Sequence, residues 1–227
     1  MARSIAVLLA FMAVALAPAI HAAADPWKQG THYVVLPQAQ RTSVPTGKVE
    51  VLEVFSYGCI ACNSFQPVME KLKSSLPPTA QMAYLHASFN KSESWPIFQR
   101  GFVAAQALGI AERTHQGIFD AIWKTGELAV VDNATHALKN PQPTLSDVAR
   151  TYERLAGVKA ATFLATANSF GVEAKMRAAD GQIEAMMIPG TPSLVVNGKY
   201  RVNMDSVRSI DELLQLVNYL VAKESGH

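Results

Sequence analysis

The sequence predicts an α/β fold: a mixed sheet flanked by helices, with a helical domain inserted into it. Two observations carry this prediction. Strand-like segments surround an apolar helix in the first third, and strand character returns only near residue 193. Between them, residues 92–187 have helical spacing throughout. We therefore expect a discontinuous sheet domain, residues 25–91 and 188–227, around an inserted helical domain, residues 92–187.

The first 24 residues have the pattern of a secretory signal peptide, with an apolar stretch over residues 5–16 and a cleavage site after Ala24. A membrane anchor is the alternative, but a span needs roughly 20 apolar residues. Pro18 and His21 interrupt this stretch too early. We expect an exported chain that begins at Asp25.

Composition narrows the class of protein further. A hydrophobic fraction of 49% is enough for an ordinary core, and a net charge of +2 gives no reason to expect nucleic acid or anionic lipid as a partner. Only two cysteines occur. A small exported domain that depended on disulfides for its stability would carry several spaced pairs.

The first elements read as β-β-α-β. Residues 33–36 form a short extended segment, and Val49–Phe55 is the strongest strand signal because it is β-branched and aromatic. A helix follows from about Cys59 to Leu76, where Pro77 and Pro78 stop it. Residues 81–86 form the next strand, and this order predicts parallel pairing through a right-handed crossover.

The inserted segment predicts four or five helices, whose apolar stripes we assign to the core. The stripes are Trp95, Phe98, Phe102 and Ala105; Ile118, Phe119, Ile122 and Trp123; Leu145, Val148, Tyr152 and Leu155; Phe163, Leu164, Ala167 and Phe170; and Val172, Met176, Ala179 and Ile183. After them, residues 193–196 and 199–202 predict a hairpin around Asn197-Gly198. A last helix is expected over residues 207–222.

The two cysteines form the motif Cys59-Ile60-Ala61-Cys62 directly after the strongest strand. A disulfide that closes so short a ring stabilises a fold by only about 2 kcal/mol, against nearly 5 kcal/mol for a loop of about a hundred residues. Two thiols at this spacing can instead open and close a disulfide repeatedly in exchange with other proteins. The pair therefore predicts redox chemistry.

Cys59 is expected at the junction of strand and helix. Unpaired backbone N–H groups and the positive end of the helix dipole would stabilise its thiolate and lower its pKa. Cys59 is thus the candidate nucleophile. Cys62 lies one turn further along, more buried, and is the candidate resolving thiol.

Other uses of the pair fit less well. A zinc site needs two more ligands, and the histidines show no paired spacing. Covalent haem attachment needs a histidine after the second cysteine, where Asn63 stands. A purely structural disulfide stays open as an alternative. We expect no metal.

Two further features flank the motif. Glu53 interrupts the apolar strand, either at an exposed edge or buried, and a buried carboxyl with a raised pKa could store a proton for exchange. Thr191-Pro192 stands at the entrance of a later strand, where proline leaves neighbouring backbone groups free to pair with an extended peptide. Whether that bond is cis stays open from the sequence.

Together these residues resemble the DsbA family of periplasmic thiol-disulfide oxidoreductases, which have a thioredoxin fold with an inserted helical domain. The resemblance covers nearly all of the chain after residue 24. It rests on the segment from Val51 to Cys62, on the helical insertion, and on residues 190–198. It implies a dithiol oxidase in which Cys59 is the nucleophile, Cys62 the resolving thiol and Glu53 the buried acid.

The resemblance also implies the partners. Pro192 matches the family's cis-proline, which faces the disulfide, with Thr191 before it. Substrates would be unfolded or extended secreted polypeptides with free thiols, and a DsbB-like quinone-linked membrane oxidase would restore the disulfide. No cofactor beyond the Cys59–Cys62 disulfide is expected, and the chain is expected to act as a monomer in the periplasm.

The sequence departs from the family at several positions. Many members carry Pro-His between the cysteines, where this chain has Ile60 and Ala61. A histidine there can favour the thiolate, so we expect the pKa of Cys59 to be lowered less than in those members. Gln66 stands where some relatives have an acidic residue, and Tyr84 where some have a lysine. The sequence therefore does not determine the electrostatic field around Glu53.

Two alternative functions stay open. A reductase or isomerase arm would use the same cysteines, but about 20 residues before the first long strand are too few for the dimerisation domain of known isomerases. A thioredoxin-like chaperone or peptide-binding module would carry the cysteines incidentally. The chaperone predicts that peptide binding survives replacement of Cys59 by serine.

Overall fold

The structure is a computed structural model that describes residues 25–132, 135 and 137–226. The predicted signal peptide lies outside these residues. No helix in the described part of the chain is long and apolar enough to cross a membrane.

A five-stranded sheet in the order β1-β5-β4-β2-β3 forms the centre of the molecule. The interior strand β2 pairs in parallel with β3, as the β-α-β order predicts, and antiparallel with β4. All seven residues of β2 are buried, including Glu50 and Glu53, which explains why apolar residues occupy the other five positions. The strands are β1 (Tyr33–Val35), β2 (Val49–Phe55), β3 (Ala80–His86), β4 (Ser193–Val196) and β5 (Tyr200–Val202).

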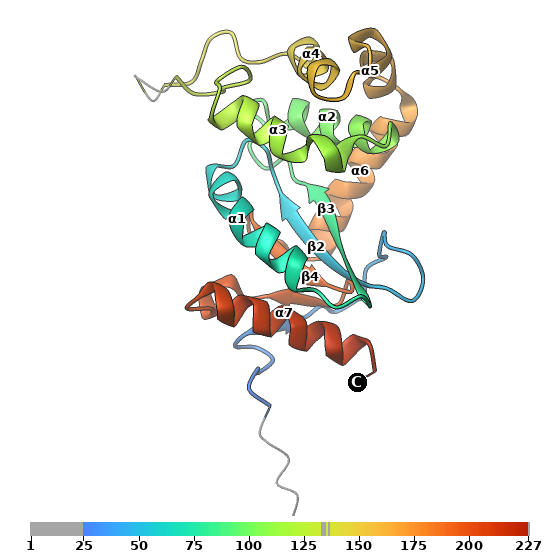
Figure 1. Ribbon diagram of the computed structural model, residues 1–227, viewed down its shortest axis with the longest axis vertical. Helices are drawn as coiled ribbons and strands as arrows, with labels where there is room; N and C mark the ends of the chain where they lie inside the picture. The colour runs from blue at the N-terminus through green and yellow to red at the C-terminus, as the bar shows by residue number, and fades with distance from the viewer. Residues whose placement is uncertain (1–24, 133–134, 136, 227) are drawn as a thin grey trace, which may run out of the picture.

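Helices cover both faces of the sheet (Figure 1). Helices α1 (Ile60–Ser75) and α7 (Ile210–Glu224) share one face, where Met69 and Leu216 pack with Val51 of β2. Helix α6 (Phe170–Ala185) covers the other face, where Ile183 packs with Val54. The predicted mixed sheet flanked by helices is confirmed.

The remaining helices form a layer at one end of the sheet, beyond the carboxyl ends of β2 and β3 (Figure 1). Their core extends into the sheet, because Phe55 and Tyr57 belong to the same buried cluster as Phe98, Phe119 and Tyr152. The helices are α2 (Trp95–Ala107), α3 (Ala111–Trp123), α4 (Leu145–Ala156) and α5 (Ala160–Ala167).

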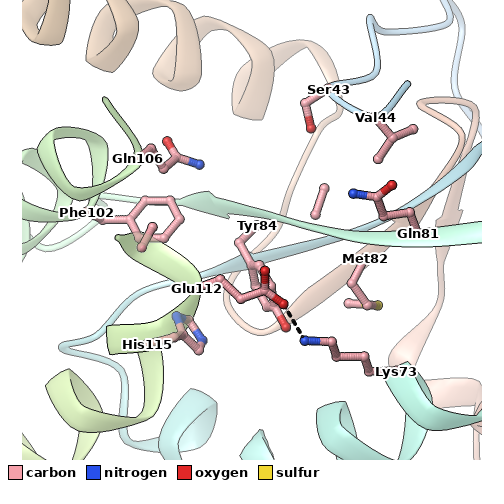
Figure 2. A pocket seen from close by; sticks show the side chains of 12 residues that line it. Ser43, Val44, Lys73, Gln81, Met82, Tyr84, Phe102, Gln106, Glu112 and His115 are labelled. Carbon is pink, nitrogen blue, oxygen red and sulfur yellow. Dashed lines mark hydrogen bonds and ion pairs between the residues drawn. The ribbon is translucent and has the colours of Figure 1, made fainter. Parts of the chain in front are cut away.

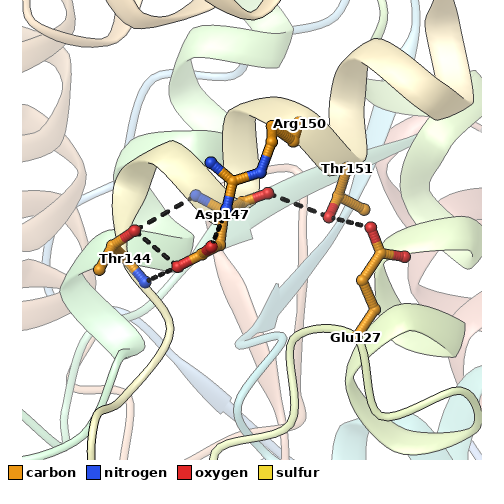
Figure 3. Close-up of polar contacts among 5 residues, drawn as sticks. All are labelled: Glu127, Thr144, Asp147, Arg150 and Thr151. Atoms are coloured by element: carbon orange, nitrogen blue, oxygen red, sulfur yellow. Dashed lines mark hydrogen bonds and ion pairs between the residues drawn. The ribbon is translucent and has the colours of Figure 1, made fainter.

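A capping box begins α4 (Figure 3). The Thr144 hydroxyl accepts a hydrogen bond from the backbone N–H of Asp147, and the Asp147 carboxylate accepts one from the Thr144 N–H at 2.8 Å. The hydroxyl is a second acceptor for the Asp147 N–H, which also donates to the Thr144 carbonyl, and the carboxylate pairs the N–H of the N-cap residue. Further along the helix, the Thr151 hydroxyl donates to Glu127 at 2.7 Å, which ties α4 to the loop after α3.

The structure corrects two details of the predicted elements. The last helix begins at Ile210 rather than at residue 207, because the Ser209 hydroxyl caps it after a short 3₁₀ turn. Phe170 was predicted in the core but is 81% exposed. Ser169 caps a new helix immediately before it, so the apolar period of α5 does not continue through Phe170.

Candidate active site

Cys59 is the N-cap residue of α1, at the end of a short turn that follows β2. Its backbone is extended, and its sulfur accepts a hydrogen bond from the Cys62 backbone N–H at 3.4 Å. The side chain is half-buried. Because β2 ends and α1 begins near Cys59, this sulfur lies beside the unpaired N–H groups of the first helical turn, as predicted.

The pKa of Cys59 is lowered to about 6. The largest cause is a hydrogen bond from the Cys62 thiol, and the Thr191 side chain and the backbone N–H groups of Ala61 and Cys62 add to it. Together these outweigh the opposing effect of burial. The predicted direction is confirmed, but the helix terminus is only part of the cause, because the second thiol makes the largest contribution.

Cys62 is fully buried, and its pKa is raised well above the ordinary range. The hydrogen bond that it gives to Cys59 is the largest cause, and burial adds to it. The two sulfurs are therefore unequal: in the dithiol form, one proton stays on Cys62 while Cys59 carries the negative charge.

The Pro192 loop faces this pair. The Thr191–Pro192 peptide bond is cis, and the Thr191 carbonyl oxygen lies 3.3 Å from the Cys59 sulfur, which donates to it in the thiol form. Behind it, the Ser193 hydroxyl donates to the Gly190 carbonyl at 2.7 Å and closes the loop. The structure thus brings together residues that are 132 positions apart.

The two residues inside the motif point to solvent. Ile60 is 65% exposed, and Ala61 is also exposed. Ala61 acts on the sulfur only through its backbone N–H, since a methyl side chain can donate no hydrogen bond. The surface around Cys59 is consequently apolar.

Glu53 lies in the middle of the interior strand β2 and is fully buried. The alternative of an exposed edge is therefore wrong. Its two carboxylate oxygens have no hydrogen-bond partner among the described residues. Burial, with a smaller contribution from the charge of Cys59, raises its pKa to about 8, so the carboxyl is mostly protonated at neutral pH.

Tyr84 lines a pocket of about 250 Å³ beside β3. It pairs with Glu53 in the sheet register, and it lines the pocket together with His115. Figure 2 shows the ion pair of Lys73 with Glu112, 2.6 Å long, beside Tyr84. Burial and then the charge of Glu53 raise the pKa of Tyr84 well above its ordinary value, so this phenol stays neutral. Unlike a lysine at this position, it carries no positive charge that could stabilise a Glu53 carboxylate.

The turn before Cys59 is held by side chains from distant elements. The Tyr57 backbone N–H donates to Nε2 of His86 at 3.0 Å, and Nε1 of Trp123 donates to the Tyr57 carbonyl at 2.8 Å. Burial lowers the pKa of His86 to about 3, so this ring stays neutral and can accept. These roles were not predicted from the sequence, because an apolar stripe does not reveal which polar atom faces the site.

Gly58 lets Trp95 approach the same turn closely. A Cβ atom at position 58 would lie 2.5 Å from Nε1 of Trp95, nearer than any ordinary contact. The indole is fixed in turn by Glu93, whose carboxylate accepts its N–H at 3.1 Å. The sequence showed only that a glycine precedes the motif.

The arrangement suits thiol-disulfide exchange. The described residues contain no group of three or more His, Cys, Asp or Glu side chains placed to hold a metal ion. What they contain is a low-pKa sulfur at a helix start, a buried thiol beside it, a strand-entry loop against it and a protonated carboxyl beneath.

Known proteins with similar sequences and structures agree with this chemistry. The thiol:disulfide interchange protein DsbA of Pseudomonas aeruginosa is 32% identical over 218 residues, which are 96% of this chain and 95% of that protein. The crystal structure of Pseudomonas aeruginosa DsbA superposes with a TM-score of 0.72 at 32% identity, over 89% of this chain and 97% of that chain.

A second solved structure, oxidoreductase DsbA from Xylella fastidiosa, also gives a TM-score of 0.72, at 29% identity over 86% of this chain and 96% of that one. No family model matches the sequence. The structural likeness runs through the sheet and the helical layer, and it confirms the predicted thioredoxin-like fold.

Proposed function

Because this chain belongs to the DsbA family of thiol-disulfide oxidoreductases, we propose that it is a dithiol oxidase that donates the Cys59–Cys62 disulfide to thiols of newly secreted polypeptides. The observation that carries the proposal is the unequal pair of sulfurs, with the pKa of Cys59 near 6 and that of Cys62 well above its ordinary value. No cofactor beyond this disulfide is needed.

Donation of the disulfide takes two exchange steps. A substrate thiolate attacks the Cys59 sulfur, the Cys59–Cys62 bond breaks, and Cys62 leaves with the electron pair. The protonated Glu53, beneath the pair on β2, can supply the proton that Cys62 takes up. A second substrate thiolate then attacks the substrate sulfur of the mixed disulfide, and Cys59 leaves as a stable thiolate. The substrate gains one disulfide, and the enzyme gains two electrons.

Reoxidation uses the same residues in the opposite order. The Cys59 thiolate attacks a disulfide of a partner, for which we propose a DsbB-like quinone-linked membrane oxidase. Cys62 then loses its proton, with Glu53 as a nearby acceptor once that carboxyl is ionised, and attacks the Cys59 sulfur. In this half-reaction Cys59 is the nucleophile and Cys62 the resolving thiol.

The low pKa of Cys59 favours oxidation of substrates over their reduction. A thiol with a pKa near 6 is ionised at pH 7, and this ionisation stabilises the reduced enzyme relative to the disulfide form. The couple is thereby more oxidising than that of an ordinary thiol pair. A reductase would need the opposite bias, and this contrast weighs against the reductase or isomerase alternative.

The Pro192 loop supports binding of an extended substrate. Its Thr191 carbonyl faces the reacting sulfur, so a peptide that pairs with the loop backbone brings its cysteine to Cys59. We propose that the protein acts as a monomer in the periplasm on unfolded or extended chains, after removal of residues 1–24.

A single experiment tests the oxidase. The chain from Asp25, equilibrated in glutathione buffers, is mixed with a reduced peptide that carries two cysteines, and the peptide disulfide is followed by chromatography. We expect rapid oxidation by the native protein and loss of this activity in Cys59→Ser. Equal rates would refute the oxidase, and peptide binding that survives in the variant without any turnover by the native protein would support the chaperone alternative.

A further inference from the structure

A cavity of about 460 Å³ lies at the edge of the sheet, where β3, α2, α6 and the loop between β1 and β2 meet. Its volume is within the range of about 300 to 1,000 Å³ that is usual for sites of small molecules. The residues of the redox site do not line it. Four of its lining residues form an apolar, almost fully buried floor: Leu52, Phe102, Val103 and Ala179.

Small side chains on α6 keep this cavity open. The residues of α6 that line it are Lys175, Ala178, Ala179 and Gln182. Their spacing of i, i+3, i+4 and i+7 puts them on one face of the helix. The two alanines in the middle of this face leave space that larger side chains would fill. The Gln182 side chain donates to the Arg41 carbonyl at 3.1 Å, which ties the loop that carries Arg41 to the same helix.

Two cations line the cavity without an acidic partner. Arg41 and Lys175 are exposed, and neither forms an ion pair with another described residue. Glu50 is the one carboxylate among the lining residues, and it is only 1% exposed. Its carboxylate already accepts the Ser43 N–H at 2.6 Å and the Ser43 hydroxyl at 2.7 Å. A guanidinium and an ammonium group at one cavity therefore attract an anion, such as a carboxylate.

The cavity continues along β3 into the pocket of Figure 2, because both are lined by Ser43, Tyr84, Phe102 and Gln106. In that second pocket the charges are balanced, since Lys73 and Glu112 pair with each other at 2.6 Å. The unbalanced positive charge is thus confined to the end beside α6. The whole groove combines a cationic end with a longer, charge-balanced extension.

We propose that this groove binds a single-chain anionic amphiphile, a small molecule with a carboxylate head and an apolar tail. The head pairs with Arg41 and Lys175, and the tail covers the buried floor and runs along β3. Removal of the tail from water supplies most of the affinity, and the two cations select for negative charge. An anionic membrane presents a broad surface, whereas this site is a cavity with a buried floor, which favours a small molecule.

Decanoate is the probe for the test, used below the concentration at which it forms micelles. Isothermal titration calorimetry measures its binding to the protein in the disulfide form. We expect decanoate to bind at least tenfold more tightly than decanol or decyltrimethylammonium, which carry the same tail with a neutral or cationic head. Octanoate should bind about tenfold more weakly than decanoate, because two fewer methylene groups are buried.

The double variant Arg41→Gln with Lys175→Gln tests the head of the ligand. Its affinity for decanoate should fall about tenfold, and its preference for decanoate over decanol should disappear. The matched control is Lys71→Gln with Arg208→Gln, which removes two exposed cations that do not line the groove. The control should bind decanoate like the native protein. In both double variants the Cys59–Cys62 disulfide should oxidise dithiothreitol at the native rate, which shows that they are folded.

The other outcomes overturn the proposal. Absence of decanoate binding, or equal affinity for decanoate and decanol, refutes an anion-selective site. Unchanged affinity in the groove variant, or an equal loss in the control, shows that any binding occurs elsewhere. Binding to phosphatidylglycerol vesicles that requires Arg41 and Lys175, with no binding of decanoate, assigns these cations to a membrane surface instead. None of these results bears on the redox activity of the cysteines.

Discussion

At the scale of single residues, the chemistry depends on two acidic groups, the Cys59 thiol and the Glu53 carboxyl, whose surroundings favour opposite protonation states. Cys59 is stabilised as an anion by donors around its sulfur, whereas Glu53 is disfavoured as an anion because its carboxylate is buried without a partner. The negative charge of Cys59 further raises the pKa of Glu53. The reduced enzyme therefore keeps its charge on the sulfur and its proton on the carboxyl.

Ala61→His tests how far the sulfur is already stabilised. An imidazole beside the helix start can donate to the thiolate and, when charged, attract it. We expect the pKa of Cys59 to fall below its value of about 6 and the couple to become more oxidising. The ultraviolet absorbance of the thiolate, followed against pH, measures this. Ala61→Gln is the uncharged control, and an unchanged or higher pKa in the histidine variant contradicts the expectation.

Glu53→Gln tests the buried carboxyl through the pH dependence of stability. The folded pKa near 8 lies above the unfolded value of 4.5, so between these values the folded state holds a proton that the unfolded state has lost. The free energy of unfolding should therefore fall as pH rises from about 4.5 to 8, by up to about 5 kcal/mol. The glutamine variant should lack this decline.

The measurement is urea unfolding of the disulfide form between pH 4 and 9. Neither sulfur titrates in this form, and burial, the main cause of the raised pKa of Glu53, remains. At pH 4 the two proteins should be similar, and at pH 8 the variant should be the more stable. Parallel curves across this range would show that Glu53 is ionised in the native protein. Glu70→Gln, on the exposed side of α1, is the matched control.

At the scale of elements, the ends of helices determine more than their interiors. Cys59 begins α1, Thr144 begins α4, and Ser209 begins α7, each through a side chain that accepts a backbone N–H. In α4 and α7 the cap only stabilises the helix. In α1 the capping atom is the reactive sulfur, so the same geometry that starts the helix also lowers the pKa of its cap.

Thr144→Ala tests an ordinary cap against this background. Loss of the hydroxyl removes one of the two acceptors of the Asp147 N–H and leaves only the Thr144 carbonyl, and we expect the free energy of unfolding to fall by about 1 kcal/mol. Urea unfolding measures the change. Thr144→Ser keeps a hydroxyl and should recover most of the loss; equal stability of the serine and alanine variants would show that the capping box contributes nothing.

At the scale of the whole molecule, the helical layer and the sheet share one core at the active site. Phe55, Tyr57 and Cys62 belong to the same buried cluster as the helices α2 to α5. The turn before Cys59 is fixed by Trp123 from α3 and by His86 from β3. The helical layer is therefore part of the machinery that positions the sulfur.

Trp123→Phe tests this coupling. The variant keeps an aromatic ring but removes the donor to the Tyr57 carbonyl, which should lower the stability by about 1–2 kcal/mol. If the turn sets the position of the sulfur against its N–H donors, the pKa of Cys59 should also rise, as measured by thiolate absorbance. Trp27→Phe, near α7, is the control; a loss of stability with no change in this pKa would show that Trp123 is only structural.

The sequence by itself determined the strands, most helices and the motif, because these depend on local patterns. Val49–Phe55 is rich in β-branched and aromatic residues, Asn197-Gly198 allows the left-handed backbone of a tight hairpin, and Pro77-Pro78 ends a helix. The position of Cys59 at a helix start follows from the same signals. The exposure of Phe170 and the start of α7 were not predicted, because in each case a serine cap begins a new helix with its own apolar period.

Only the tertiary structure decided which distant groups meet. It buried Glu53 by placing β2 between β3 and β4, and it brought the Thr191 carbonyl into contact with Cys59. It also placed His86 and Trp123 where they hydrogen-bond the Tyr57 backbone. These contacts join segments far apart along the chain, and no local pattern encodes them. Burial and partner atoms set a pKa, and both become defined only when the chain has folded.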